Sequence, residues 1–232
     1  MKIISLNNIL MVTAVAVSQH CLSQGFVNLA FEDATIILAG SQNTIEASSA
    51  LPGWTAYFGS SSNPILGAQT TIGYDTVSLG GAMVAIEDSN APGGVPLPIQ
   101  GNYSVLLEGS IPFAAVLASI GQTGTIPNTT KSLTFFGNLA GNISGENLQI
   151  TFNGQNIPFS AIGNGANYTI YGANIAGYAG QTGQLLFTTP VQTSALLDNI
   201  QFSSASVPEP STLGLATLGA LLLGFRRWQN TL

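Results

Sequence analysis

Carboxylates are the side chains in this sequence that could most readily do chemistry. Two carboxylates on opposite sides of a glycosidic bond can hydrolyse it, one as an acid and the other as a base or nucleophile. The sequence does not fix the distance between any two, and no motif singles out a pair. Scattered surface charges are therefore the simpler interpretation, and no catalytic residue is predicted. The carboxylates between residues 25 and 206 are Glu32, Asp33, Glu46, Asp75, Glu87, Asp88, Glu108, Glu146 and Asp198.

The one histidine and the one cysteine, His20 and Cys21, adjoin an apolar run near the N-terminus. A cationic start at Lys2, this apolar run and a small-residue exit are typical of a secretory signal peptide, predicted over residues 1–24. A lipidated Cys21 is the alternative, which the bulky His20 before it disfavours. Removal of the peptide would exclude Ser-His-Asp triads and metal sites built on imidazole or thiolate, whereas calcium held by oxygen atoms alone would remain available.

The charge of the chain is low and acidic. Charged residues make up 6% of the sequence, the formal net charge is −6 and 45% of the residues are hydrophobic. Lys131 is the only basic residue between Gly25 and Ser206. Such an acidic body repels phosphate backbones, so we expect no nucleic-acid partner.

Residues 25–206 have the pattern of one all-β domain. In "LQITF" (148–152) apolar and polar residues alternate, and Asn153-Gly154 follows as a hairpin signal before "QNIPF". Repeated short strands with turn signals between them indicate a sandwich or barrel. By contrast, 112–120 is expected to be extended or irregular, and "EDSN" (87–90) a solvated turn. The other predicted strands are 26–31, 76–80, 83–87, 103–109, 132–137, 167–172, 184–189 and 196–203.

The order of several short motifs carries a resemblance. The chain has "FVNLAFED", "LPGWTAYFG", "GNYSVLLEG", "LQITFNGQ" and "LLDNIQFS" in that order. This order resembles the jelly-roll sandwiches of the galactose-binding-like and carbohydrate-binding-module type. The resemblance implies a jelly-roll-like antiparallel β-sandwich over residues 25–206.

Asp198 is the best candidate for a calcium ligand. Strict alternation would place Leu196, Asp198, Ile200 and Phe202 on one face, which puts a carboxylate among core residues where it needs a partner. The resemblance to these sandwiches implies a structural calcium between an early Phe-Glu strand end and this late Asp, which match Glu32 and Asp198. The alternatives are a carboxylate that accepts backbone N–H bonds and a bulge that turns Asp198 outward.

Sugar recognition would need exposed aromatic faces beside polar hydrogen-bonding groups. Trp54, Tyr168 and Tyr171 are the ligand-binding candidates. Trp54, in "LPGWTAYF", is better interpreted as a packing residue. No cofactor is predicted apart from the structural calcium.

The C-terminal segment, residues 207–232, combines "VPEPST", an apolar run and Arg226-Arg227. The 13 residues from Leu213 to Phe225 give about 20 Å of helix, against a hydrocarbon core of about 30 Å. The arginines would stay on the cytoplasmic side, with the folded domain outside. A plain short membrane anchor is one interpretation.

All three parts of this tail resemble the PEP-CTERM sorting signal of bacterial exported proteins. The resemblance implies transient anchoring in the inner membrane and processing by an exosortase at or near Pro208, Glu209 and Pro210, with Arg226 and Arg227 completing the motif. The predicted function is therefore that of a non-enzymatic protein exported to the cell surface or extracellular polysaccharide matrix, with a structural or adhesive role. A carbohydrate-binding module that recognises extracellular glycans is the alternative, with exopolysaccharide as partner, and a carboxylate-based glycosidase is the least favoured.

Overall fold

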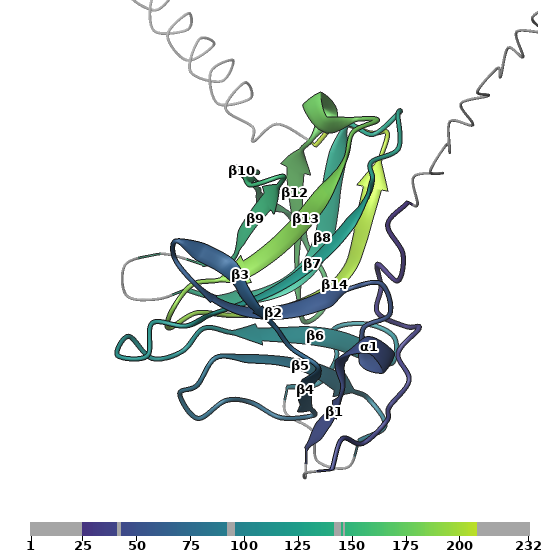
Figure 1. Ribbon diagram of the computed structural model, residues 1–232. Coiled ribbons are helices and arrows are strands. Elements are labelled where there is room, and N and C mark those ends of the chain that lie inside the picture. Colours follow the sequence, from purple (N-terminus) through teal and green to yellow (C-terminus); the bar gives the residue numbers. More distant parts are fainter. Residues whose placement is uncertain (1–24, 41–42, 92–95, 142–144, 146, 208–232) are drawn as a thin grey trace, which may run out of the picture.

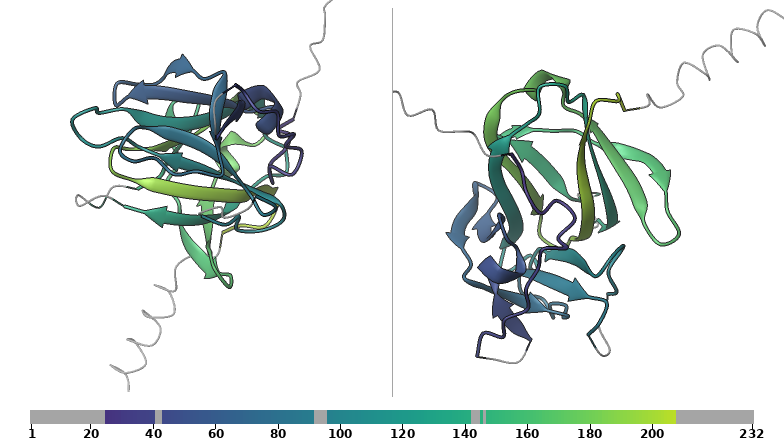
Figure 2. Two further views of the ribbon diagram at one scale, coloured as in Figure 1. Left: turned by 90° about the horizontal axis from the view of Figure 1, so that it is seen from below. Right: turned by 90° about the vertical axis from the view of Figure 1, so that its right-hand side faces the viewer.

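A computed structural model describes residues 25–207 apart from 41–42, 92–95, 142–144 and 146. Two β-sheets pack face to face as a sandwich, with very little helix (Figure 1, Figure 2). The predicted all-β sandwich is thereby confirmed. Neighbouring strands are antiparallel except for one parallel pair, β4 with β5.

One sheet has eight strands and runs through the whole molecule. Its order begins with early strands at the lower end of Figure 1 and finishes with later ones at the upper end. In spatial order the strands are β1 (Thr44–Glu46), β4 (Thr71–Tyr74), β5 (Met83–Asp88), β6 (Tyr103–Glu108), β14 (Ser194–Ser203), β8 (Ser132–Ala140), β12 (Thr169–Asn174) and β11 (Ser160–Asn164).

The second sheet has six strands and contains the predicted hairpin. Asn153 and Gly154 form its turn, both with positive φ (49° and 75°), as a tight two-residue turn requires. In order the strands are β10 (Gln155–Asn156), β9 (Gln149–Phe152), β13 (Thr182–Thr189), β7 (Leu117–Thr125), β2 (Thr55–Ser60) and β3 (Asn63–Ala68). The helical elements are one turn each, α1 (Ala47–Ala50) and η1 (Ala176–Tyr178).

Two strand predictions are wrong. Residues 26–31 form turns, because Asn28 and Phe31 take positive φ values of 49° and 59°. Residues 76–80 form a loop that begins at Asp75, whose φ is 48°. A single residue with positive φ ends a strand, but a prediction from the alternation of apolar and polar residues does not detect it. The segment 112–120 is irregular only as far as 116, since β7 begins at Leu117.

The core between the sheets is built from large apolar side chains of both. Trp54 lies between two fully buried phenylalanines, with ring centroids 5.8 Å from Phe31 and 6.1 Å from Phe187, and Phe187 meets Phe135 edge-on at 5.8 Å. Burial of each such ring contributes about 1.5–3 kcal/mol. A single core of this kind holds both sheets in place.

The predicted signal peptide and sorting tail lie outside the described residues, except for the first residue of the tail, Val207. Within the described part of the chain, no helix has the length and apolar character needed to span a membrane.

Candidate functional site

A cleft opens where the chain leaves the six-stranded sheet at β10 and enters the eight-stranded sheet at β11. Ile157 continues the ladder by donating its N–H to the carbonyl of Ile150 (2.8 Å). Pro158 follows, which has no N–H to donate, and the chain crosses to the other sheet. The cleft has a volume of about 690 Å³, within the usual range of about 300–1,000 Å³ for ligand sites. Its lining residues are Asn147, Leu148, Gln149, Ile150, Thr151, Asn156, Ile157, Pro158, Phe159, Ser160, Ala161 and Tyr171.

Three rings at the cleft fix one another in place. Phe159 meets Tyr171 edge-on at 5.5 Å and the buried Phe135 edge-on at 5.4 Å. Phe135 and Tyr171 stack at 5.2 Å with an interplanar angle of 19°. Phe159 and Tyr171 are only half-buried, so both contribute aromatic surface held rigidly by Phe135.

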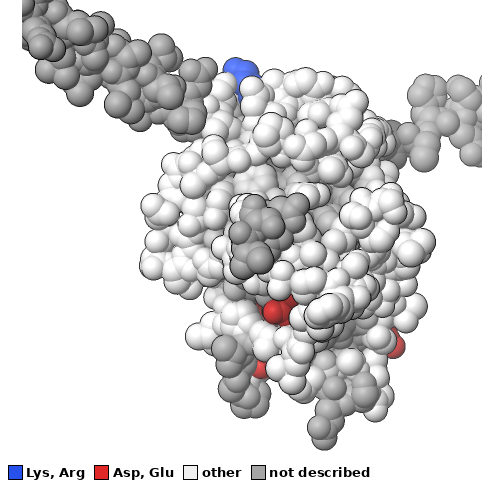
Figure 3. All heavy atoms as spheres, turned by 90° about the vertical axis from the view of Figure 1, so that its left-hand side faces the viewer, with Lys and Arg blue, Asp and Glu red and all other residues white. Residues whose placement is uncertain are grey.

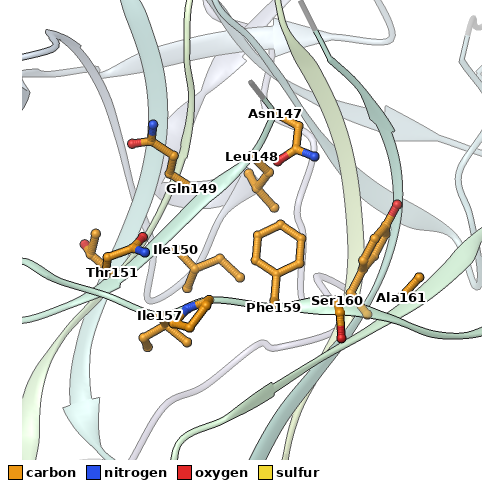
Figure 4. Close-up of a pocket in the computed structure, with 12 residues that line it drawn as sticks. Asn147, Leu148, Gln149, Ile150, Thr151, Ile157, Phe159, Ser160 and Ala161 are labelled. Atoms are coloured by element: carbon orange, nitrogen blue, oxygen red, sulfur yellow. The ribbon is translucent and has the colours of Figure 1, made fainter. Parts of the chain in front are cut away.

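Figure 4 shows how the side chains around Phe159 lie. The Phe159 ring points into the space beside Leu148 and Ile150, whereas Gln149 and Thr151 project to the opposite side of β9. Alternation along β9 thus separates an apolar wall from a polar one. Amides at the cleft, which can both donate and accept hydrogen bonds, accompany the rings, and none of the lining residues that the structure describes is charged.

Of the three aromatic candidates, only Tyr171 lies in this cleft. Trp54 is 5% exposed and donates its Nε1–H to the carbonyl of Asn28 (3.1 Å), so it is a packing residue and presents no open face. Tyr168 stacks on Phe136 at 4.3 Å on the outer face of the eight-stranded sheet. Phe159, the ring at the centre of the cleft, was missed because its neighbours give no signal for a chain crossing between sheets.

The carboxylates occupy a different part of the molecule. Between residues 109 and 197 the described chain has no Asp or Glu, whereas seven lie between 32 and 108 and one at 198. On the face shown in Figure 3, the acidic atoms lie in the lower half, and the described surface above them is uncharged apart from a basic group at the upper edge. The cleft residues belong to the carboxylate-free part, by which we mean the described residues of 109–197 and therefore not Glu146.

Asp198 is buried, with 1% of its surface exposed, but does not face the core between the sheets. A bulge separates Asp198 from Gln201 in β14, and Asn199 within it has a φ of 45°. Leu196 packs in the outer cluster of the sheet, and Ile200 lies in the inner core. The predicted strict alternation through this strand is therefore wrong, because the bulge shifts the pattern by one residue.

Polar partners surround the Asp198 carboxylate. Oδ2 accepts hydrogen bonds from the Ser104 hydroxyl (2.9 Å) and the Gln100 N–H (3.1 Å), and Oδ1 accepts one from the Asn199 N–H (2.6 Å). Burial raises the pKa of Asp198 to about 6, although these three hydrogen bonds oppose the shift. The nearby Glu32 adds a smaller upward contribution to this pKa.

Glu32 meets Asp198 across one turn. Its carboxylate accepts the N–H of Asn102 at both oxygens (2.9 and 3.1 Å) and that of Tyr103 at Oε1 (3.3 Å). Gly101 in this turn has a φ of 63° and lies against the Glu32 carboxylate, where a Cβ would collide. The two predicted calcium ligands thus reach the same turn, each already bonded to its backbone.

Calcium at Glu32 and Asp198 stays a prediction. Their contacts match the first alternative, a carboxylate that accepts backbone N–H bonds, and the bulge matches the second. Within the described ranges, no group of three or more Asp, Glu, His or Cys residues is placed to share a metal ion.

The segment 87–90, expected to be a solvated turn, begins inside β5 with two buried carboxylates. Glu87 is 0% and Asp88 5% exposed. Asp88 accepts hydrogen bonds from the Tyr74 hydroxyl (2.9 Å) and from the N–H of Asn90 (2.8 Å). Neither oxygen of Glu87 has a partner.

Solved structures of similar shape were found at low identity. A cyclase from Fischerella sp. TAU is 13% identical with a TM-score of 0.41, over 77% of this chain and 94% of that one. A family 11 carbohydrate-binding module from Clostridium thermocellum is 12% identical with a TM-score of 0.36, over 72% and 97%. Such a module was among the predicted resemblances. Sequence identities of 12–13% show no shared ligand or activity.

The C-terminal tail gave a family match. No curated protein matches the chain. Residues 206–227 match the model of the PEP-CTERM protein-sorting motif, which confirms the tail prediction. The match includes Pro208, Glu209, Pro210, Arg226 and Arg227, all outside the described residues. The chain therefore carries the sorting signal of an exported protein that an exosortase processes at the membrane.

Proposed function

We propose that this exported protein binds a neutral extracellular polysaccharide in the cleft between β9–β10 and β11–β12. Binding there would give the sorted protein its structural or adhesive role at the cell surface or in the exopolysaccharide matrix. The observation that carries the proposal is a cleft of about 690 Å³ that combines two half-buried rings with amide and hydroxyl groups and has no charge among its described lining residues.

The chemistry of the lining fits a sugar polymer. Phe159 and Tyr171 offer apolar surface to the C–H face of a sugar ring. Asn147 and Asn156 are exposed amides at the cleft, and each can donate to one sugar hydroxyl and accept from another. These are the two kinds of contact that sugar recognition needs.

The lack of charge in the lining favours a neutral polymer over an acidic one. A uronic acid bound there would lose water without gaining a cationic partner, which is costly. The only described basic residue, Lys131, is not in the cleft, and the net charge of −6 repels polyanions at longer range.

Binding without catalysis fits the same residues. Glycoside hydrolysis by the usual route needs two carboxylates across the scissile bond, and the described lining offers none. The proposal is therefore a binding protein rather than a glycosidase.

Affinity electrophoresis through gels that contain single polysaccharides tests the binding proposal. The wild-type protein should be retarded by at least one neutral glucan, mannan or galactan and not by alginate or pectate. Phe159→Ala should restore free mobility, because it removes the central ring. Tyr168→Ala is the matched control, since its ring lies outside the cleft, and it should bind like wild type. Free mobility of the wild type in every neutral gel would refute the proposal.

A second experiment tests the sorted, adhesive role. A strain whose protein lacks residues 207–232 should secrete the folded protein but lose it from the cell surface. A Phe159→Ala strain should display it normally and yet lose attachment to matrix. Surface display that is unchanged without the tail would contradict sorting by this signal.

A further inference from the structure

Asp75 and Glu87 lie side by side at the junction of β4 and β5. This is the one parallel pair in the described sheets, with Gly73 opposite Ala85 and Tyr74 opposite Ile86. The ladder continues one step further, since the N–H of Asp75 donates to the carbonyl of Ile86 (2.9 Å). The next residues in register are Asp75 and Glu87.

Three oxygen atoms of these two carboxylates are buried and have no hydrogen-bond partner. Glu87 is 0% exposed, and neither Oε1 nor Oε2 accepts a hydrogen bond. Oδ1 of Asp75 is also buried without a partner. More than nine in ten buried polar groups in proteins have a partner, so three adjacent exceptions indicate a missing positive charge.

No side chain supplies that charge. Lys131 is the one basic residue of the described chain, and it precedes β8, which β6 and β14 separate from β5. Burial, then Asp75 and then Glu108 raise the pKa of Glu87 to about 8. Protonation alone does not satisfy all three oxygens: a protonated Glu87 could donate its O–H to Oδ1 of Asp75, but its carbonyl oxygen would still have no donor.

We propose that Asp75 and Glu87 hold a hard divalent cation, with calcium as the best match, at the junction of β4 and β5. Calcium takes six to eight oxygen ligands, and carboxylates with backbone carbonyls and water are its usual set. Two carboxylates would balance the charge of one such ion. The binding would stabilise the start of the loop that follows β4 and would not depend on the polysaccharide cleft.

This site differs from the predicted one at Glu32 and Asp198. There the carboxylate oxygens accept backbone N–H bonds, which point the donors at the oxygens that a cation would need. At the proposed site, Oδ1 of Asp75 and both oxygens of Glu87 have no hydrogen-bond partner, although the nearby backbone of Asp88 and Thr76 opposes the upward shift that burial gives the pKa of Asp75 and Glu87 respectively. Calcium could bind at either pair of carboxylates, so variants of each pair are needed to show which one binds the ion.

Thermal unfolding of the full exported protein in EDTA and in 5 mM CaCl₂ tests the proposal. For an affinity typical of extracellular calcium sites, calcium should raise the Tm of the wild type by about 5 °C. Glu87→Gln and Asp75→Asn should each lose most of this shift. Asp198→Asn and the exposed Asp33→Asn should keep it. Calorimetric titration with CaCl₂ should give one site in the wild type and none in Glu87→Gln.

Two results would overturn the proposal. One is a wild-type Tm that calcium leaves unchanged up to 10 mM. The other is a calcium shift that both variants retain but Asp198→Asn loses, which would assign the ion to Glu32 and Asp198. If Glu87→Gln did not fold, as judged by circular dichroism, the half-buried Asp75→Asn would decide between these outcomes.

Discussion

The acidic part of the molecule, residues 32–108 with Asp198, and its carboxylate-free part, the described residues of 109–197, bury and expose polar groups differently. The acidic part buries three carboxylates, of which Asp88 and Asp198 have specific hydrogen-bond donors and Glu87 has none. The carboxylate-free part forms a cleft from rings, amides and hydroxyls that need no counter-charge. A chain with 6% charged residues thus places its carboxylates where they shape the fold, and leaves its ligand surface neutral.

Asp198→Ala should have the largest effect, because it tests whether a buried carboxylate of the acidic part is structural. The change removes the acceptor of three hydrogen bonds, which the Ser104 hydroxyl and the N–H groups of Gln100 and Asn199 donate. We expect a loss of about 3 kcal/mol or more in the free energy of unfolding, measured by urea denaturation. The exposed Asp33→Ala should change it by less than about 0.5 kcal/mol. Equal losses of stability in Asp198→Ala and Asp33→Ala would contradict a structural role for the buried carboxylate of Asp198.

The pH dependence of stability should distinguish the two buried acids. A raised pKa in the folded state means that the folded protein holds its proton more tightly, so the stabilisation is lost as pH rises from the unfolded to the folded value. For Asp198 the loss ends near pH 6, and for Glu87 near pH 8. In EDTA, the wild-type Tm should therefore fall by about 3 °C or more between pH 6 and 8. Glu87→Gln should flatten this interval, whereas a slope that survives the change would show that another group titrates.

Asn156→Ala should have a smaller effect, confined to polysaccharide binding. Loss of one neutral hydrogen bond costs about 1 kcal/mol, or about fivefold in affinity. Asn164→Ala is the matched control, an exposed amide in β11 that does not line the cleft. Affinity electrophoresis at graded polysaccharide concentrations measures both, and equal weakening would mean that the amides of the cleft are not the contacts.

Ionic strength should have the smallest effect. An uncharged cleft with a neutral ligand has no ion pairs to screen, so affinity should change less than about twofold between 50 and 500 mM NaCl. A steep loss with salt would place the ligand on charged residues of the acidic part instead.

The sequence predicts the sandwich well because strands with one buried face repeat a two-residue pattern. The strand β9 and its hairpin at Asn153-Gly154 follow from it directly, whereas β5 and β6 are buried on both faces and were predicted from their runs of apolar residues. Left-handed residues such as Asn28 and Asp75 end that pattern, and because a single Asn or Asp also occurs within strands, 26–31 and 76–80 were mistaken for strands.

The candidate sites were less predictable from the sequence. Tyr171 was identified by residue type, but its partner Phe159 depends on where the chain crosses between the sheets. Glu32 and Asp198 were paired through a resemblance, and the structure brings them to one turn. Glu87 begins the polar run "EDSN", which indicated a solvated turn, yet it is fully buried at the end of β5.

Isothermal titration calorimetry with two hexasaccharides tests the neutral-cleft proposal most directly. One is a neutral hexasaccharide from a polysaccharide that retards the wild type, and the other an oligouronate of equal length. The neutral ligand should bind at least about tenfold more tightly than the oligouronate, and Phe159→Ala should weaken it by about tenfold or more, with Tyr168→Ala unchanged. Equal affinity for the oligouronate, or full affinity in Phe159→Ala, would contradict the proposal.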